Sequence, residues 1–278
     1  MKQIQSQQSL GERVVYVTRL VQRHEIPRMA EIQHDAFNDP NNTTADEVSI
    51  ILAIDEHIEA GRQLTRKERV ANLMERQQEY FDQSKYTVVG VYLQPSCSPF
   101  PSDQREQDVE TLDQESIKLL SRECTLVGFS IWQNITSTSP AESPQTDAKE
   151  VSNPTFSNRF FAKMNRTRES TMKGKSYWFL KLLTIHPNHQ RRGIGSTLVK
   201  WGTTKANQQG IQAWLESSPM GIPTYLKAGF KILGIDTIKE PRAKRGFVEW
   251  PYMIYESNDI NKNNNDNQQQ QQQQQQQQ

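Results

Sequence analysis

The feature that most constrains the fold of this chain is a long apolar segment followed by a glycine-containing turn and a helix. Residues 177–185 read YWFLKLLTI, and such a nearly continuous apolar run is typical of a central strand buried on both faces. The sequence His186-Pro187-Asn188 predicts the end of this strand, because proline cannot donate to the ladder. After QRRGIG at 190–195, apolar residues at helical spacing predict a helix from Ser196 to about Gln209. The order of strand, turn and helix indicates a mixed α/β domain.

The turn before this helix has the composition of an anion-binding site. The first N–H groups of a helix have no partner within it, and the helix dipole adds partial positive charge, so helix N-termini bind phosphate. Gly193 and Gly195 would let a phosphate approach the backbone, and Arg191 and Arg192 add positive side chains. A Walker loop is excluded because its Lys-Ser/Thr is missing, and a dinucleotide fingerprint is excluded because Leu198 replaces its third glycine.

A second strand and a tyrosine-bearing helix follow. Residues 212–216 (QAWLE) predict the strand. Ser217-Ser218 and Pro219 are suited to the cap and first turn of a helix. This helix would carry Tyr225 and end at Gly229-Phe230.

These motifs together resemble the GNAT superfamily of N-acetyltransferases, in its fungal-type branch. Gln-x-x-Gly-x-Gly after strand-His-Pro is similar to the acetyl-CoA signature of that family, and Leu-Glu-x-Ser-Pro-x-Gly-x-x-x-Tyr-x-x-x-Gly-Phe at 215–230 is similar to its continuation. Gly128-Phe129-Ser130-Ile131-Trp132 resembles the strand that precedes the cofactor strand. The resemblance implies a mixed, mostly antiparallel sheet flanked by helices. Two parallel strands of that sheet, here 177–185 and 212–216, would splay apart to admit acetyl-CoA.

The resemblance also implies roles for individual residues, with acetyl-CoA as cosubstrate and no metal. Tyr225 would protonate the departing CoA thiolate. Glu216 is the carboxylate nearest the expected splay and is the candidate base, with His186 or a water relay as alternatives. Main-chain groups of the strand would bind the pantetheine arm and those of the turn the pyrophosphate. The implied cofactor-binding residues are Leu183, Thr184, Ile185, Gln190, Arg191, Arg192, Gly193, Ile194, Gly195 and Ser196.

The remaining segments are expected to complete one acetyltransferase domain over residues 13–256. Polar segments at about 95–122 and 134–176 are expected to be disordered inserts within it. Residues 1–12 are expected to be flexible, and the Asn/Gln-rich residues 257–278 are expected to form a disordered low-complexity tail.

Two capping boxes predict helices in the N-terminal half, where an acceptor could be covered. They lie at Thr44–Glu47 and Thr65–Glu68. The first helix is rich in carboxylates that would suit a polycationic amine, although a solvated helix face explains them more simply. These carboxylates belong to Asp46, Glu47, Asp55, Glu56 and Glu59.

Composition narrows the class of partner. A formal net charge of +1 argues against a protein that coats nucleic acid, and the basic residues of 159–175 fit a solvated insert better. Two cysteines and no paired-cysteine or histidine motif predict neither a disulfide framework nor a metal site. No apolar run approaches the roughly 20 residues of a membrane helix, so a cytoplasmic protein is expected, with a nuclear location left open. The expected acceptor is a small-molecule or protein amine of unspecified identity, and the alternative is a catalytically weak acetyl-CoA-binding module that acts through partners.

Overall fold

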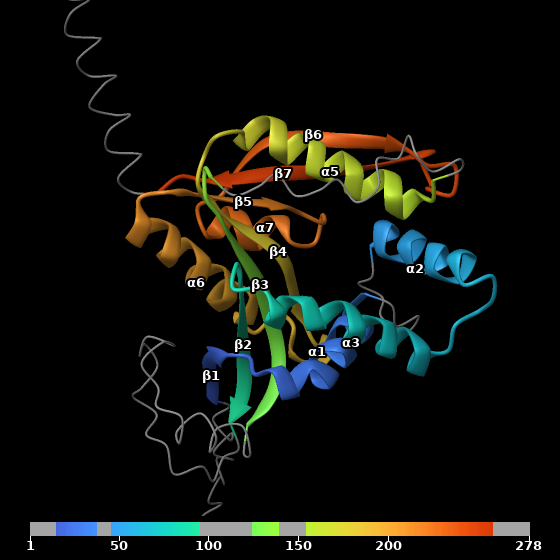
Figure 1. The fold of residues 1–278 in the computed structure, drawn as a ribbon, viewed down its shortest axis with the longest axis horizontal. Helices are drawn as coiled ribbons and strands as arrows, with labels where there is room; N and C mark the ends of the chain where they lie inside the picture. Colours follow the sequence, from blue (N-terminus) through green and yellow to red (C-terminus); the bar gives the residue numbers. More distant parts are fainter. Residues whose placement is uncertain (1–14, 38–45, 95–123, 139–153, 258–278) are drawn as a thin grey trace, which may run out of the picture.

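A computed structural model describes residues 15–37, 46–94, 124–138 and 154–257 (Figure 1). They form a seven-stranded sheet in the order β1-β2-β3-β4-β5-β7-β6. The strands are β1 Val15–Leu20, β2 Tyr86–Gln94, β3 Thr125–Ile135, β4 Tyr177–Ile185, β5 Gln212–Glu216, β6 Lys231–Lys239 and β7 Phe247–Tyr255. The helices are α1 Ile26–Phe37, α2 Glu47–Glu59, α3 Arg66–Asp82, α5 Phe156–Met172, α6 Ile194–Gln209 and α7 Ile222–Lys227, with short 3-10 turns at Arg23–Glu25 and Pro187–His189.

Only one pair of neighbouring strands among the described residues is parallel. β4 and β5 run in the same direction, whereas the other pairings, on both sides of them, are antiparallel. The predicted fold class, a mostly antiparallel mixed sheet with one parallel pair and flanking helices, is therefore confirmed.

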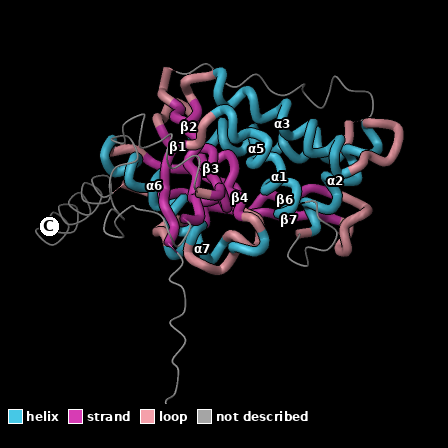
Figure 2. The backbone as a smooth tube through the Cα atoms, turned by 90° about the horizontal axis from the view of Figure 1, so that it is seen from below, coloured by secondary structure: helices cyan, strands magenta, loops and turns pink. Residues whose placement is uncertain are grey.

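Helices cover both faces of the sheet, because successive residues of each strand point to opposite sides. Figure 2 shows α1, α3 and α5 on one side of the strands and α6 and α7 on the other. On the first side Met29 and Ile32 of α1 pack against Phe129 and Ile131 of β3. On the second side Leu198 and Val199 lie in one core cluster with Leu180 and Leu215. The β4–β5 pair is thus held between two layers.

The close contact of α6 with the sheet depends on a glycine. A Cβ atom at Gly202 would lie 2.1 Å from the ring of Trp132. No real Cβ atom can occupy that position, so the absence of a side chain sets the distance between α6 and β3.

The expectation of a disordered insert over 134–176 is wrong for its described residues. β3 extends to Ile135, and residues 156–172 form α5, which lies along β6 and β7 in Figure 1. Its buried residues include Phe156, Phe160, Arg168 and Met172, spaced four or eight residues apart on one face of the helix. Exposed polar and basic residues between them mask this stripe in the sequence. Two of those basic residues form ion pairs with the β6 region, Arg159 with Glu240 at 2.9 Å and Lys163 with Asp236 at 3.2 Å.

Three predicted helix starts shift, and one is confirmed. α6 begins at Ile194 instead of Ser196, with Gly193 at its N-cap position. α2 begins at Glu47 with Asp46 as its cap, whose side chain accepts from the Ser49 N–H at 2.8 Å. α3 begins after Thr65 with both capping-box hydrogen bonds present, as predicted. α7 begins at Ile222 instead of Pro219, because residues 218–221 form a turn closed by the Gly221 N–H and the Ser218 carbonyl at 3.0 Å.

The predictions for residues 1–12, 95–122 and 258–278 lie outside the described residues. Within the described ranges, no helix is both long enough and apolar enough to cross a membrane.

Candidate active site

The site is built around the point where β4 and β5 separate. The two strands are paired from Tyr177 with Gln212 to Leu180 with Leu215. β4 then continues to Ile185 along β3, and a bulge at Lys181 bends it, since Trp132 pairs with Leu180 but Ile131 pairs with Leu182. The edge of Leu182–Ile185 that faces β5 consequently pairs with no strand in the described part of the chain. The predicted splay between 177–185 and 212–216 is present.

A left-handed turn leads from the end of β4 into α6. Arg191 has φ +60° and Gly193 has φ +83°, and together these residues reverse the chain. The Gln190 side chain donates to the Ile185 carbonyl at 3.2 Å and ties the turn to the strand. Ile194, Gly195 and Ser196 form the first turn of α6, where backbone N–H groups have no partner inside the helix.

Glycine at 195 keeps the space between this turn and the strand end open. A Cβ atom there would lie 3.3 Å from Ile185 Cδ1, 3.6 Å from Thr224 Cγ2 and 3.8 Å from Leu183 Cδ2. β4, α6 and α7 therefore converge at Gly195. The structure brings the predicted residues 183–185 and 190–196 together at one end of the splay.

Two residues beside this turn were not identified from the sequence. The Tyr16 hydroxyl lies 3.4 Å from His189 Nδ1 and accepts from Arg192 at 3.4 Å. Burial and the Arg192 charge lower the pKa of His189, so its ring is mostly neutral near pH 7. Tyr16 comes from β1, far away in the sequence, and no local pattern indicates its proximity.

A cavity of about 330 Å³ lies beside the splay. Its floor includes Leu180–Leu183, and Glu216 and Tyr225 reach it from β5 and α7. Helices α1, α2, α3 and α5 provide its other walls. The residues from these helices are Gln33, Phe37, Ser49, Leu52, Ala53, Asp55, Glu56, Glu59, Leu73, Arg76, Ser157, Phe160, Phe161 and Met164.

Tyr225, the candidate acid, is 7% exposed and lines this cavity. Burial raises its pKa well above the usual value, which keeps the phenol protonated at neutral pH. Among the described residues its hydroxyl has no hydrogen-bond partner. Gly221 leaves room for its ring, because a Cβ atom there would lie 2.6 Å from Tyr225 Cε2.

Glu216, the candidate base, is buried, with a side chain that is 4% exposed. Its Oε1 accepts from Trp214 Nε1 at 2.7 Å and lies 3.7 Å from an Arg168 guanidinium nitrogen. Burial raises the pKa of Glu216, and Arg168 opposes that rise. Glu216 therefore both forms an ion pair and faces the cavity.

Arg168 could not be identified from the sequence, because its helix was expected to be disordered. It is buried, donates to Asn165 at 2.9 Å and stacks on Phe179 at 4.0 Å from the ring centroid. These contacts hold its guanidinium beside Glu216.

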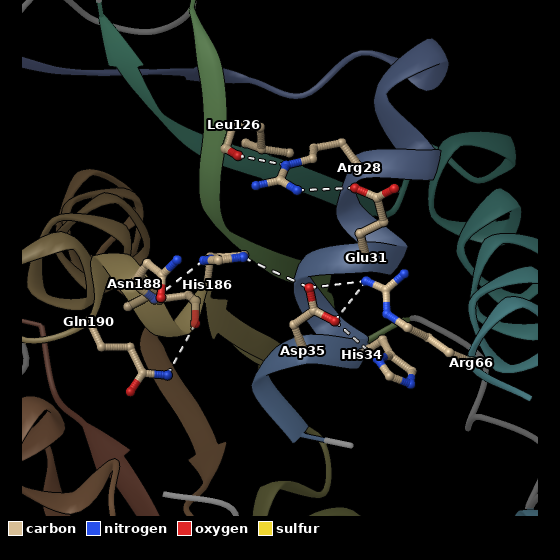
Figure 3. A network of polar contacts seen from close by, with 10 residues as sticks. Arg28, Glu31, His34, Asp35, Arg66, Leu126, His186, Asn188 and Gln190 are labelled. Atoms are coloured by element: carbon tan, nitrogen blue, oxygen red, sulfur yellow. Dashed lines mark hydrogen bonds and ion pairs between the residues drawn. The ribbon is translucent and has the colours of Figure 1, made fainter. Parts of the chain in front are cut away.

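His186, the alternative base, lies away from the cavity. Figure 3 shows its ring between Asn188 and Asp35 of α1. Its Nε2 is 3.8 Å from the Asp35 carboxylate, and its Nδ1 accepts from the Asn188 N–H at 3.3 Å. Asp35 also binds Arg66 at 2.8 Å. Because both ring nitrogens have partners and the ring does not line the cavity, Glu216 is better positioned for proton transfer there.

Of the α2 acids expected to attract a polycation, three line the cavity: Asp55, Glu56 and Glu59. The other two have structural contacts elsewhere, since Asp46 caps α2 and Glu47 accepts from the Lys244 N–H at 2.7 Å.

Two of the three cavity acids are already neutralised. Asp55 accepts from Arg242 at 2.8 Å and from the Ser157 N–H at 2.7 Å. Glu56 pairs with Arg69 at 3.0 Å and with Arg76 at 3.4 Å.

Within the described ranges, no group of three or more His, Cys, Asp or Glu side chains is arranged to hold a metal ion.

The site thus combines strand divergence, a left-handed turn at a helix N-terminus and a buried tyrosine beside a cavity. Residues 161–232 match the model of the acetyltransferase (GNAT) domain. This part of the chain therefore carries a GNAT acetyltransferase domain, as the sequence resemblance predicted.

A curated relative supports this assignment over a limited region. It is described as an acetyltransferase of Stachybotrys chartarum (strain CBS 109288 / IBT 7711) and is 28% identical over 90 residues. The matched region is 32% of this chain and 38% of the relative, so it spans little more than a third of that protein.

Solved structures resemble the chain over most of its length at low identity. Arabidopsis thaliana NAA60 in complex with a bisubstrate analogue is 11% identical with a TM-score of 0.47, covering 88% of this chain and 99% of that one. The ribosomal-protein-S18-alanine N-acetyltransferase of Escherichia coli is 12% identical with a TM-score of 0.41, covering 87% and 94%. Because these scores lie below 0.5, the family resemblance rests on the matched domain at residues 161–232.

Proposed function

We propose that this chain transfers the acetyl group of acetyl-CoA directly to an amine. The observation that carries the proposal is the divergence of β4 and β5 beyond Leu180 and Leu215. Three features meet where the strands diverge. They are the unpaired edge of β4, the left-handed turn proposed to bind phosphate, and a cavity lined by a buried tyrosine and a buried carboxylate. These are the groups that a thioester cosubstrate and an amine acceptor require.

The cosubstrate would lie along the open edge of β4. Main-chain groups of Leu183, Thr184 and Ile185 would pair with its pantetheine amides, as an added strand would. Backbone N–H groups from Arg191 to Ser196 would hold its pyrophosphate, with Arg191 and Arg192 adding charge. The fit is supported by Gly195, where a methyl group would enter the space beside Ile185.

Two side chains would carry the proton transfers. Glu216 takes one proton from the acceptor ammonium and passes it to solvent, which frees the nitrogen lone pair. As the C–N bond forms and the C–S bond breaks, the Tyr225 hydroxyl protonates the departing sulfur. The second nitrogen proton then restores the Tyr225 phenol, so CoA thiol, the amide and one released proton are the products.

Cosubstrate binding is tested by thermal unfolding with and without acetyl-CoA. A ligand that binds only the folded state stabilises it by about 2.7 kcal/mol at about one hundred times Kd. We expect a clear rise in Tm for the wild type and none for Gly193→Glu, which places a carboxylate at the phosphate turn. Gly174→Glu is the matched control, because Gly174 also has a positive φ, +72°, and open surroundings.

The outcomes separate the proposed enzyme from the alternatives. Absence of a wild-type shift at saturating acetyl-CoA contradicts the proposal. If a shift is present, release of CoA thiol with a panel of amines tests catalysis. Binding without thiol release from any amine would instead support the acetyl-CoA-binding module.

A further inference from the structure

We infer that the acceptor is a small amine with one positive charge and an apolar body, and that Phe161 contributes to its recognition. This inference rests on the proposed function and concerns the substrate class of the same site. It follows from the composition of the cavity walls, from the pairing of their charges and from the size of the cavity.

Two helices present apolar side chains to the cavity. On α2 these are Leu52 and Ala53, which lie among the polar lining residues of the same helix, Ser49, Asp55, Glu56 and Glu59. Residues 157, 160, 161 and 164 form the lining stripe on α5, and three of them are Phe160, Phe161 and Met164. Aromatic rings and a methionine offer apolar contact that adapts to ligand shape.

Apolar residues also complete the cavity on the sheet side. Leu180, Leu182 and Leu183 of β4 line it, as does Leu73 of α3. The body of an acceptor lying between α2, α5 and β4 would therefore exchange water for hydrocarbon over most of its surface.

The charges on the walls favour a single ammonium group. Arg242 neutralises Asp55, and Arg69 and Arg76 neutralise Glu56, as described above. Because Arg69 and Arg76 share one carboxylate, this wall keeps an excess of positive charge, which would repel a second ammonium group.

Glu216 is the carboxylate that best fits the reacting nitrogen. It ends β5 beside the splay, and its contacts with Trp214 and Arg168 both use Oε1. A carboxylate has about four acceptor positions, so an ammonium can still bind it. Glu59 lies on the exposed side of α2, where its carboxylate accepts from the Thr155 hydroxyl at 3.1 Å.

The cavity volume of about 330 Å³ limits the size of the acceptor, because the acetyl end of a cosubstrate along Leu183 would share this space. This value is at the lower end of the roughly 300–1,000 Å³ of small-molecule sites. It suits an arylalkyl or branched alkyl amine better than a long polyamine.

The first experiment compares three amines with the full chain and saturating acetyl-CoA. The amines are 2-phenylethylamine, ethylamine, which lacks an apolar body, and spermidine, which is polycationic. We expect kcat/KM for 2-phenylethylamine to exceed both others by about tenfold or more, since apolar contact discriminates on that scale.

The second experiment tests the α5 wall with a matched pair of variants. Phe161 is 38% exposed, so Phe161→Ser should leave the fold intact. We expect kcat/KM for 2-phenylethylamine to fall about three- to tenfold in this variant, with ethylamine unchanged. Ile58→Ser is the control, because Ile58 is an exposed apolar residue of α2, 59% accessible, that does not line the cavity.

Each outcome separates the inference from the proposed function. Turnover of spermidine or ethylamine that equals or exceeds that of 2-phenylethylamine overturns the inference and leaves the acetyltransferase proposal intact. An equal loss in Phe161→Ser and Ile58→Ser also overturns the role of Phe161. If acetyl-CoA stabilises the protein but no amine is acetylated, the proposed function fails and the inference fails with it.

Discussion

At the scale of single residues, the candidate site combines groups whose burial alters their acid–base chemistry. Tyr225 and Glu216 both line the cavity, and burial raises the pKa of each. The raised pKa keeps the phenol protonated, as an acid requires. For Glu216, the rise moves the pKa of the carboxyl group towards neutral pH, where a general base is most effective.

Replacing Tyr225 tests the acid directly. We expect Tyr225→Phe to lower kcat by about 10²-fold, the lower end of general acid–base effects. Stabilisation by acetyl-CoA should persist, because the ring still fills its place beside Gly221. Tyr255→Phe is the control, since that hydroxyl binds Asn207 outside the cavity. Equal losses in activity and acetyl-CoA binding would exclude an acid role.

The pH dependence of the reaction tests the Arg168–Glu216 pair. Activity should rise with pH as Glu216 loses its proton. Arg168 stabilises the carboxylate, so Arg168→Gln should raise the pKa of Glu216 further and move the acidic limb of kcat/KM to higher pH. Arg166→Gln removes an exposed charge from the same helix and should leave the limb in place. An unchanged limb in Arg168→Gln would remove Glu216 from the role of base.

At the scale of elements, the site depends on how closely helices approach the sheet. The turn proposed to bind phosphate leads into α6, whose position is fixed by the contact of Gly202 with Trp132. α5 supplies Arg168 and one cavity wall. Neither contribution is local, because each requires packing between elements far apart in the chain.

The close contact between Gly202 of α6 and Trp132 leads to a prediction about the stability of the fold. Within a helix, Gly→Ala normally stabilises by roughly 0.5–1 kcal/mol. At Gly202 the methyl group would overlap the Trp132 ring, so we expect Gly202→Ala to destabilise by about 1–3 kcal/mol. Urea unfolding measures the change, with Lys200→Ala on the exposed side of α6 as control. A stabilised variant would show that α6 is not held against Trp132.

At the scale of the whole molecule, the parts that could be predicted are those with a local signal. The bounds of β4 and β5, at 177–185 and 212–216, follow from apolar runs and the turns that end them. The glycine turn and Tyr225 follow from motif spacing. The charge-rich composition of residues 156–172 did not indicate that they form an ordered helix. The stability of α5 comes from Phe156 and Phe160, which pack against distant elements.

A network across the molecule connects the cavity to the end of the sheet. Asp55 of α2 binds Arg242 in the β6–β7 turn, and Arg242 also binds Glu240 at 2.6 Å. Glu240 in turn binds Arg159 of α5. Residues from three separate segments therefore hold α2 and α5 in place as the two cavity walls, and no sequence pattern indicates a pairing between residues 55 and 242.

Breaking this network should weaken both the fold and acceptor binding. The Asp55 side chain is 3% exposed, so Arg242→Gln leaves a buried carboxylate without its cation, a change that typically costs about 3–5 kcal/mol. We expect that loss in urea unfolding, together with a higher KM for amines and unchanged stabilisation by acetyl-CoA, because the β4–α6 turn lies elsewhere. Arg245→Gln in the same turn breaks an exposed pair with Glu249 and should cost about 1 kcal/mol or less. If both variants lose equal stability, the Asp55 pair does not hold α2. If KM for amines is unchanged in Arg242→Gln, α2 is not a wall of the acceptor site.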